Sequence, residues 1–451
     1  MTSTKFETKP LFTRQQLTAL LLPLIAEQAL SVTIGLADTL MVSSVGEAAV
    51  SGVSLVDTFN TLMIQIMTAL ATGGAVVASQ YIGHREEKSA RAAAAQIMFI
   101  MSSFSILVAA VVVVGRHAIL RGIFGSIDAD VMRYAETYFL LSALSYPFIG
   151  LYNAGAALFR AQGNSKVSMM SSLVMNVVNI GGNAILIFGF GMGVLGAALA
   201  SLVSRAIACI AVLFLLQKPG CMLRIEGLAA LRPNGRLIQR ILRVGIPAGI
   251  ENGMFQIGKL SVASLTSTLG TAAIAANAVA NNLDGMGTIP GKALGLAMIT
   301  VVGRCIGAGD SEQAVYYTKK LLVWAYIAMG VFNGAILLFL PQIVSIYALS
   351  GATMQLAVLL VQIHAGFAIL LWPASFVLPN ALRAANDVKF TMVTSILSMA
   401  IWRLGFSYLI GVRMGLGAIG VWIAMVVDWV CRVVCFVLRF RSGVWKTKYI
   451  A

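Results

Sequence analysis

The chain contains few charged residues. Asp, Glu, Lys and Arg make up 11% of its 451 residues, whereas 59% are hydrophobic and the mean hydropathy is +0.88. A soluble globular protein of this length needs more polar surface to cover its core. The composition therefore excludes an ordinary soluble domain and predicts a polytopic membrane protein.

Histidine and cysteine are also scarce, with three and five copies. An intramembrane enzyme needs a nucleophile beside a base, or a pair of metal ligands; the histidines form neither, and no HExxH helix or GxSxG turn stands out. The cysteines have neither zinc spacing nor a disulfide pattern, so we expect them to be packing residues. The sequence thus predicts no enzymatic activity, no cofactor and no metal centre. The residues concerned are His84, His117, His364, Cys209, Cys221, Cys305, Cys431 and Cys435.

Long apolar runs separated by short polar joints fill most of the chain. Runs of about 20 residues suit membrane-spanning helices. They are continuously apolar, whereas the strands of a membrane barrel alternate between lipid-facing and interior residues, so the pattern favours an all-α protein. We predict twelve transmembrane helices, at 15–41, 52–80, 93–115, 134–156, 166–190, 193–216, 240–267, 274–302, 318–341, 353–381, 390–411 and 415–438.

Basic residues concentrate in alternate joints. The formal net charge is +15, and the joint after the sixth span alone contains Lys218, Arg224, Arg232 and Arg236. Joints on the opposite side hold few basic residues, such as Arg413. This is the positive-inside pattern. We therefore expect a multi-pass protein of the cytoplasmic (inner) membrane with both termini in the cytoplasm, and no nucleic-acid partner.

The sequence repeats itself at an offset of 224 residues. Pro23 and Glu27 recur as Pro247 and Glu251. Six spans precede the joint between the copies, an even number, so both copies enter the membrane in the same orientation and the repeats are parallel. This predicts a two-lobe transporter with an N-lobe of residues 1–216, a cytoplasmic linker of 217–239 and a C-lobe of 240–451.

Polar residues inside the spans are candidate functional residues, because a charge at the bilayer centre costs at least about 2.5 kcal/mol. In the first span, Glu27 and Asp38 lie within about 20° of one helix face. The fifth, seventh and eighth spans also present polar residues at helical spacing. These residues are Asn176, Asn179 and Asn183; Glu251, Gln256 and Lys259; and Asn277, Asn281 and Asp284.

Comparing the two copies separates shared from unshared polar residues. Glu27 and Glu251 occur in both, each one turn after a proline, which favours a structural role in bracing a helix interrupted by Pro. Asp38, by contrast, falls on Val262. A protonatable carboxylate present in one copy is suited to exchanging H⁺ or a small cation. The alternative is that Asp38 makes a satisfied hydrogen bond between helices.

The asparagines of the fifth span are unshared as well. Asn179 and Asn183 fall on Arg403 and Ser407 of the second copy. The first copy alone therefore has an acid near a group of neutral amides. We expect the driving ion to bind where the repeat differs.

Several motifs occur in order along nearly the whole chain. They are Pro23-Leu-Ile-Ala-Glu27, Asp38-Thr-Leu-Met-Val-Ser-Ser-Val-Gly46, Leu158-Phe-Arg160-Ala-Gln-Gly163-Asn-Ser-Lys166, Gly193-Val-Leu-Gly196-Ala-Ala-Leu-Ala-Ser201, and Asp428-Trp429 with Arg432. Taken together, these motifs resemble the multidrug and toxic compound extrusion (MATE) family. The resemblance implies a polyspecific efflux antiporter driven by H⁺ or Na⁺, with two lobes that form a V-shaped cleft.

The same resemblance implies a cation-coupling site in the N-lobe. It would place Asp38 as the titrating or ion-binding acid, with Asn179, Asn183 and Ser201 as oxygen-bearing partners. This chain departs from some members because Asn183 stands where they have a second aspartate. Fewer anionic oxygens weaken the case for a tight Na⁺ site. The tenth span has no acid, only His364, which we expect to be a packed or cavity-facing residue.

The prediction is a secondary active efflux antiporter. It would export organic, cationic and amphipathic compounds in exchange for H⁺ or Na⁺ by alternating access, as a monomer in contact with membrane lipid. Glu27, Glu251, Gln256, Asn277, Asn281 and Asp284 are expected to be cavity-lining or structural polar residues. A flippase for a lipid-linked precursor is the alternative; it would need a strongly cationic cleft, for which Lys259, Lys292 and Arg403 are the candidates. A channel is a further alternative, against which the paired repeats argue.

Overall fold

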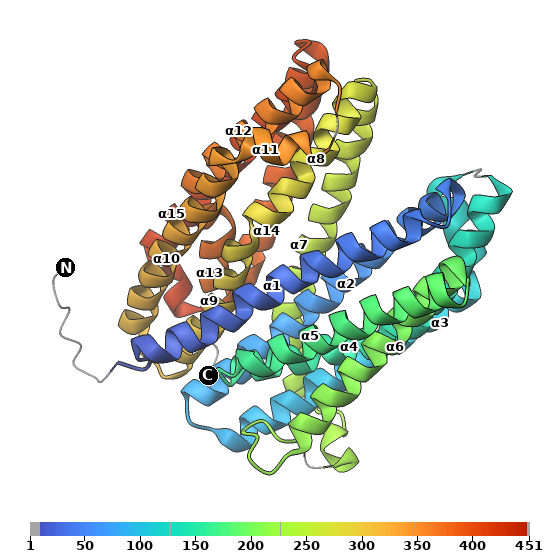
Figure 1. Ribbon diagram of the computed structural model, residues 1–451. Coiled ribbons are helices and arrows are strands. Elements are labelled where there is room, and N and C mark those ends of the chain that lie inside the picture. Colours follow the sequence, from blue (N-terminus) through green and yellow to red (C-terminus); the bar gives the residue numbers. More distant parts are fainter. Residues whose placement is uncertain (1–9, 126–127, 226, 348, 449–451) are drawn as a thin grey trace. The chain divides into compact units, whose positions relative to one another are not determined.

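The structure is a computed structural model that describes residues 10–125, 128–225, 227–347 and 349–448. Throughout these ranges the regular structure is helical, and they contain no β-strand (Figure 1). Lipid offers no partner to unpaired backbone groups, and a helix satisfies its own N–H and C=O groups internally. The predicted all-α class is therefore confirmed.

The chain folds into two compact units. We call Leu22–Gly249 the N unit, and the described residues up to Leu21 together with those from Ile250 onward the C unit. Each unit consists of one repeat, except that the unit boundaries, or seams, fall at Leu21/Leu22 and Gly249/Ile250 and not at the ends of the repeats. Helix α1, Arg14–Ser43, and helix α7, Gly235–Ser267, each run across a seam, and each contains its repeat proline near that point, Pro23 or Pro247.

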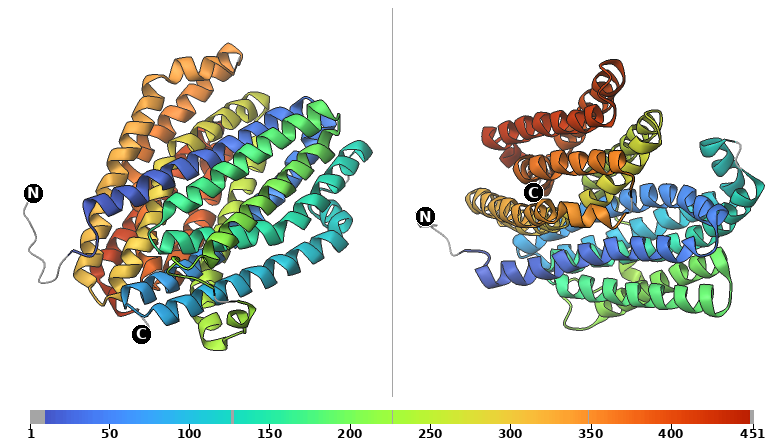
Figure 2. Two further views of the ribbon diagram at one scale, coloured as in Figure 1. Left: turned by 60° about the horizontal axis from the view of Figure 1, so that its bottom comes forward. Right: turned by 45° about the horizontal axis from the view of Figure 1, so that its top comes forward.

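The N unit contains five further membrane helices and a short 3-10 helix. Helix α4 is central and packs against α2, α3 and α6 (Figures 1 and 2). The hydrophobic core of the N unit contains many alanines together with aromatic side chains such as Phe139 and Tyr146. The elements are α2 (Glu47–Gly83), α3 (Glu87–Phe124), α4 (Ala129–Ala161), α5 (Ser165–Asn183) with the π-helical turn η1 (Ala184–Gly189), α6 (Gly193–Gln217) and η2 (Leu228–Leu231).

The C unit repeats this plan with more interruptions. Helix α9 packs against α10 and α13, and α12 packs against α8, α10 and α15. Proline starts or interrupts several of the shorter pieces. The elements are α8 (Thr271–Gly287), α9 (Ile289–Gly307), α10 (Ser311–Leu338), α11 (Leu340–Ser345), α12 (Gly351–Trp372), η3 (Pro373–Val377), α13 (Leu378–Ala384), α14 (Val388–Ser398), η4 (Met399–Gly405), η5 (Ser407–Arg413), α15 (Gly417–Ser442) and η6 (Val444–Thr447).

Each of the twelve predicted spans coincides with helix in the structure. Ten helical stretches among the described residues are long and apolar enough to cross a membrane. The other two predicted spans correspond to α4 and α7, which are helical but are not among these ten stretches. The predicted span 274–302 is two helices, α8 and α9, because the chain breaks at Thr288 before Pro290.

The seams of the two units differ from the predicted lobe boundaries. Near the start of α1, the Phe12 N–H donates to the Tyr317 hydroxyl (3.0 Å), and that hydroxyl donates to the Phe12 carbonyl (2.8 Å). The interlobe linker packs on α3, where the Gln96 amide donates to the Arg232 carbonyl (2.9 Å). The division into lobes 1–216 and 240–451 stays a prediction about the parts that move.

Glycine permits the turns and close contacts that both units need. Gly46 and Gly270, equivalent in the repeat, precede α2 and α8 with φ values of 131° and 100°, which L-residues with a side chain rarely adopt. At Gly155, a Cβ would collide with Val212 of α6. Small residues let membrane helices approach closely enough to pack backbone against side chain.

Candidate functional site

The four residues predicted to couple the cation meet in one hydrogen-bonded chain in the N unit. The Asn183 amide donates to Asp38 Oδ1 (2.5 Å) and lies 3.4 Å from Asn179 Oδ1, to which it also donates. Asn179 in turn donates to Ser201 Oγ (3.1 Å). Both asparagines are buried. The structure therefore brings the predicted residues together, while their role in coupling stays a prediction.

Local helix geometry explains this meeting. Asn179 and Asn183 are one turn apart, so both face the same side of α5. The π-helical turn η1 begins directly after Asn183. π-Turns are frequent at functional sites, where they re-aim side chains.

A second group of hydrogen-bonded polar residues lies on α2 and α4. Asn60 donates to Asp57 Oδ1 (3.2 Å) and to Ser142 Oγ (3.2 Å). The Tyr146 hydroxyl donates to Asn60 Oδ1 (2.7 Å). Asp57 is half-buried, and Asn60 holds its carboxylate in place.

One basic side chain balances the two acids only in part. Arg205 of α6 donates to Ser145 Oγ (2.7 Å) and acts electrostatically on both Asp38 and Asp57. Two carboxylates and one guanidinium leave a formal charge of −1. We call Asp38, Asp57, Arg205 and their hydrogen-bonding partners the acidic cluster.

The acidic cluster has the chemistry of a site for one small cation. Its ligands are carboxylate, amide and hydroxyl oxygens, which hard cations prefer, and a proton can neutralise a carboxylate directly. No group of three or more His, Cys, Asp or Glu side chains that could hold a metal ion occurs in the part of the chain that the structure describes.

Glu27 and Glu251 form matching buried ion pairs. Glu27 accepts hydrogen bonds from Arg160 Nη1 (2.9 Å) and Ser168 Oγ (2.7 Å). Glu251 accepts from Arg383 Nη2 (2.7 Å) and from two hydroxyls of α14, those of Ser395 and Thr391. Each pair ties a proline-containing helix to a neighbouring helix. The structural role of the two glutamates stays a prediction.

The predicted polar residues of the eighth span lie in the C unit. Asn277 Oδ1 accepts from Trp422 Nε1 (3.0 Å), and Asn281 donates to the Asn277 carbonyl (2.8 Å). Asp284 pairs with His364, with Oδ1 and Nε2 2.8 Å apart. His364 is buried and packs edge-on against two tryptophans, Trp422 and Trp429.

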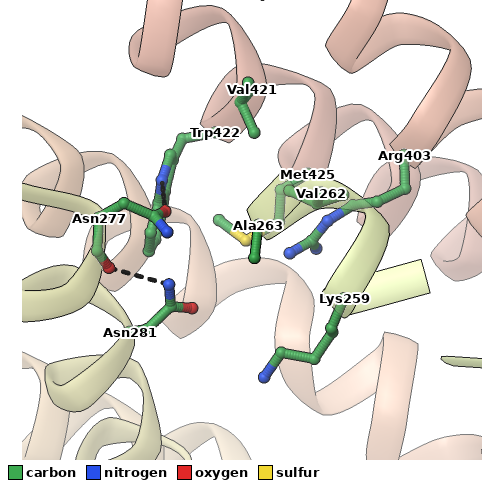
Figure 3. Close-up of a pocket in the computed structure, with 9 residues that line it drawn as sticks. All are labelled: Lys259, Val262, Ala263, Asn277, Asn281, Arg403, Val421, Trp422 and Met425. Atoms are coloured by element: carbon green, nitrogen blue, oxygen red, sulfur yellow. Dashed lines mark hydrogen bonds between the residues drawn. The ribbon is translucent and has the colours of Figure 1, made fainter. Parts of the chain in front are cut away.

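A small cavity of about 30 Å³ lies between α7, α8, η4 and α15 of the C unit. Figure 3 shows Lys259 and Arg403 reaching toward it from one side, opposite Asn277, Asn281 and Trp422. We call this the cationic pocket. Gln256, also predicted as a cavity residue, is not among the residues that line it. The remaining lining residues are Val262, Ala263, Val421 and Met425.

Sequence reasoning missed two charged members of the acidic cluster. Asp57 and Arg205 both fall inside predicted spans, at 52–80 and 193–216. The cost of an intramembrane charge, applied to every span, identifies both. Their link to Asp38 is not visible in the sequence because it depends on how α1, α2 and α6 pack.

Comparisons with known proteins agree with the repeat. A family model described as MatE matches residues 23–185 and 247–409, two segments at the offset of 224. The chain is 27% identical over 439 residues to the uncharacterized transporter YisQ of Bacillus subtilis, covering 95% of this chain and 94% of the relative. It is 26% identical over 444 residues to the probable multidrug resistance protein NorM of Thermotoga maritima, covering 97% and 94%.

Solved structures share the fold over nearly the full length. An outward-facing multidrug resistance MATE family transporter of the MOP superfamily superposes with a TM-score of 0.90 at 21% identity, covering 96% of both chains. A MOP superfamily transporter from Pyrococcus furiosus gives a TM-score of 0.89, also at 21% identity and 96% coverage of both chains. The two-lobe repeat architecture expected from the sequence is confirmed.

Proposed function

The chain belongs to the MATE family of multi-pass membrane transporters, and on this premise we propose that it is a secondary active antiporter that exports organic amphipathic compounds in exchange for H⁺ or Na⁺. The acidic cluster of the N unit carries this proposal. It offers one uncompensated negative charge inside a membrane helix bundle, a place where only an exchangeable cation restores neutrality at low cost.

Asp38 is the residue proposed to take the coupling ion. Its carboxylate lies at one end of the chain of amides that runs through Asn183 and Asn179 to Ser201. A proton neutralises the carboxylate outright, whereas Na⁺ would draw on the oxygens of Asp38, both asparagines and Ser201. In either case the charge of the cluster changes by one unit.

The proposed cycle uses this change of charge. The ion enters from outside, neutralises Asp38 and lets α1 repack around Pro23, which weakens the hold on an organic cation. The compound leaves, the lobes rock inward, and the ion is lost to the cytoplasm. One charge crossing the membrane contributes about 2.3 kcal/mol per 100 mV, enough for several tens-fold accumulation if the exchange is electrogenic.

Orientation and location are part of the proposal. Basic residues in the joints predicted to be cytoplasmic, including Lys88, Arg91 and Arg224, support a cytoplasmic position for both termini. The same bias supports insertion in the cytoplasmic (inner) membrane. We propose that the protein works as a monomer in contact with membrane lipid.

Export from proteoliposomes under separately imposed pH and Na⁺ gradients tests the function. We expect one of the two gradients to drive export of a fluorescent organic cation from the wild-type protein, and Asp38→Asn to remove that dependence. Glu87→Gln is the matched control, because Glu87 is an exposed acid at the start of α3. If Asp38→Asn exports the compound with the same dependence on the gradient as the wild type, Asp38 does not bind the coupling ion.

A flippase for a lipid-linked precursor is the second candidate function. The observation that favours it is the convergence of Lys259 and Arg403 on one pocket, since a pyrophosphate headgroup needs cationic partners. Saturable binding of a lipid-linked pyrophosphate to the purified protein, without gradient-driven export of organic cations, would favour this candidate over the antiporter.

A further inference from the structure

The cationic pocket stands at the place in the second repeat that the acidic cluster occupies in the first. At the offset of 224, Asp38, Asn179 and Ser201 correspond to Val262, Arg403 and Met425. All three of these counterparts line the cationic pocket. Equivalent positions of the two repeats therefore form a polar site in each unit, but the side chains at these positions differ.

The change reverses the sign of the charge. No carboxylate lines the pocket, and its two charged lining residues, Lys259 and Arg403, are basic. Each acidic group nearby already has a partner: Asp284 pairs with His364, and Asp428 pairs with Arg432 of the same helix at 3.1 Å.

Basic groups in and near the pocket outnumber the acidic ones, and Lys259 and Arg403 are the two that line it. Lys259 of α7 and Lys292 of α9 both act on Asp284 of α8, and Arg403 of η4 is acted on by Asp284 and Asp428. Among the described residues, Arg403 has no hydrogen bond and no ion pair within 4 Å, and its Nε is buried without a partner. Lys259 likewise makes no ion pair with a described residue.

A guanidinium without a counter-charge beside it is costly inside a membrane protein, and Arg403 is half-buried, with its Nε shielded from solvent and without a partner. Arginine presents a planar fork of donors that matches the oxygens of a carboxylate or phosphate. Met425 and, from the side opposite Arg403, Trp422 supply apolar surface in the pocket. The arrangement thus combines an oxyanion-binding group with a surface for the body of an amphiphile.

The size of the cavity limits what enters it. Its volume of about 30 Å³ exceeds the roughly 10–15 Å³ that one water molecule needs. It holds one small polar group and not a whole drug-sized molecule.

We propose that the cationic pocket binds the oxyanion group, a carboxylate or a phosphate, of an amphipathic substrate, with Arg403 as the principal ligand and Lys259 as a supporting charge. The proposal rests on the proposed export function and refines its substrate class. It predicts that substrates with an anionic group, including zwitterions, bind better than neutral compounds of the same shape.

Two probes that differ only in charge test this. Dansylglycine carries a carboxylate at neutral pH, and dansylglycinamide has the same fluorophore without that charge. Binding is measured by fluorescence to the purified full-length protein in phosphatidylcholine nanodiscs. We expect the wild-type protein to prefer the carboxylate and Arg403→Gln to lose at least about tenfold in affinity for it, with binding of the amide unchanged.

The control and a second variant keep the test decisive if Arg403→Gln folds poorly. Arg236→Gln removes an exposed arginine at the start of the same α7 that carries Lys259, and should leave both affinities unchanged. Val262→Asp supplies an internal carboxylate beside Arg403 and should abolish the preference for dansylglycine without removing a basic residue. Equal affinities for the two probes in the wild-type protein, or a preference that survives both pocket variants, would overturn the proposal.

Phosphatidylglycerol distinguishes the two sources of an oxyanion. If its addition to the nanodiscs weakens dansylglycine binding by the wild type but leaves the residual binding of Arg403→Gln unaltered, the pocket takes a lipid phosphate. If it has no effect on the wild type, the pocket takes the carboxylate of a free compound. Gradient-driven export by the same purified proteins, reconstituted into liposomes, separates this proposal from the proposed function. If export does not depend on Asp38, the proposed function fails, whereas the preference for the carboxylate probe is measured independently in nanodiscs.

Discussion

The acidic cluster of the N unit and the cationic pocket of the C unit are equivalent places in a duplicated fold with opposite charge. In the N unit, Asp38 and Asp57 outnumber Arg205; in the C unit, Arg403 and Lys259 line a cavity without a carboxylate. At the offset of 224 the π-helical turn η1 corresponds to η5, whereas η4, which contains Arg403, corresponds to part of the α-helix α5. The two places therefore differ in backbone as well as in side chains, and the proposed binding roles rest on the side-chain differences.

The buried ion pairs show the opposite behaviour. Glu27 with Arg160 and Glu251 with Arg383 keep the same residue types and nearly the same distances, 2.9 and 2.7 Å, in both units. We therefore propose that the two shared glutamates brace the fold, whereas the unshared Asp38 and Arg403 belong to binding sites. The predictions below test this distinction, from the largest effect to the smallest.

The two bracing pairs should be equivalent. Glu27→Gln and Glu251→Gln each leave a buried arginine without its counter-charge, a change that costs about 3–5 kcal/mol. We expect both variants to lose thermal stability by similar amounts in detergent, measured by differential scanning fluorimetry. A large loss for one and none for the other would show that the pairs are not equivalent braces.

Replacing an acid by its amide should affect ion coupling differently in the two units. Asp38→Asn removes the proposed ion-binding carboxylate, and with it an accumulation ratio of about 50-fold per 100 mV for one coupled charge. Asp284→Asn changes an acid that already pairs with His364 in the C unit, so coupling should persist. The steady-state accumulation ratio in vesicles at a fixed gradient measures both. Equal loss of coupling in the two variants would contradict the assignment of coupling to the N unit.

A second carboxylate in the acidic cluster should strengthen Na⁺ binding. Asn183→Asp places a new anionic oxygen beside Asp38, which its amide now contacts at 2.5 Å. Hard cations bind more tightly as the number of charged oxygen ligands rises, and we expect about a tenfold gain in Na⁺ affinity. Equilibrium binding of ²²Na⁺ to purified protein checks this. The isosteric change Asn183→Leu should give no gain.

The two basic residues of the cationic pocket should contribute unequally to the affinity for dansylglycine. Lys259 is a point charge on a flexible stem, whereas Arg403 presents a fork that matches two oxygens. Lys259→Gln should therefore reduce dansylglycine affinity about threefold, less than Arg403→Gln does. A larger loss for Lys259→Gln would assign the principal contact to the lysine.

Much of the N unit could be predicted from the sequence because its signals are local. Asn179 and Asn183 share a helix face by their spacing alone, and Asp38 stands out as an acid in an apolar run. The resemblance to the MATE family then placed these residues with Ser201. Apolar length and the repeat similarly predicted the helices, each of which the structure contains.

The rest depends on packing between helices that are distant in sequence. Lys259 and Arg403 lie on α7 and η4, and nothing in either segment shows that both reach one cavity. The break between α8 and α9 at Thr288 and the π-turns after Asn183 and around Arg403 also escape a reading based on hydropathy, because neither changes the apolar character of the run. The starts of the compact units likewise depend on contacts such as Phe12 with Tyr317.

The central claim is that the N unit alone carries the coupling ion, and ion release on substrate binding tests it most directly. Purified protein loaded with ²²Na⁺, or held with a pH indicator in weak buffer, is mixed with an exported organic cation, and the released Na⁺ or H⁺ is counted per protein. The account predicts about one ion released by the wild type and by Arg403→Gln, and none by Asp38→Asn. Undiminished release by Asp38→Asn, or its loss in Arg403→Gln, would contradict it.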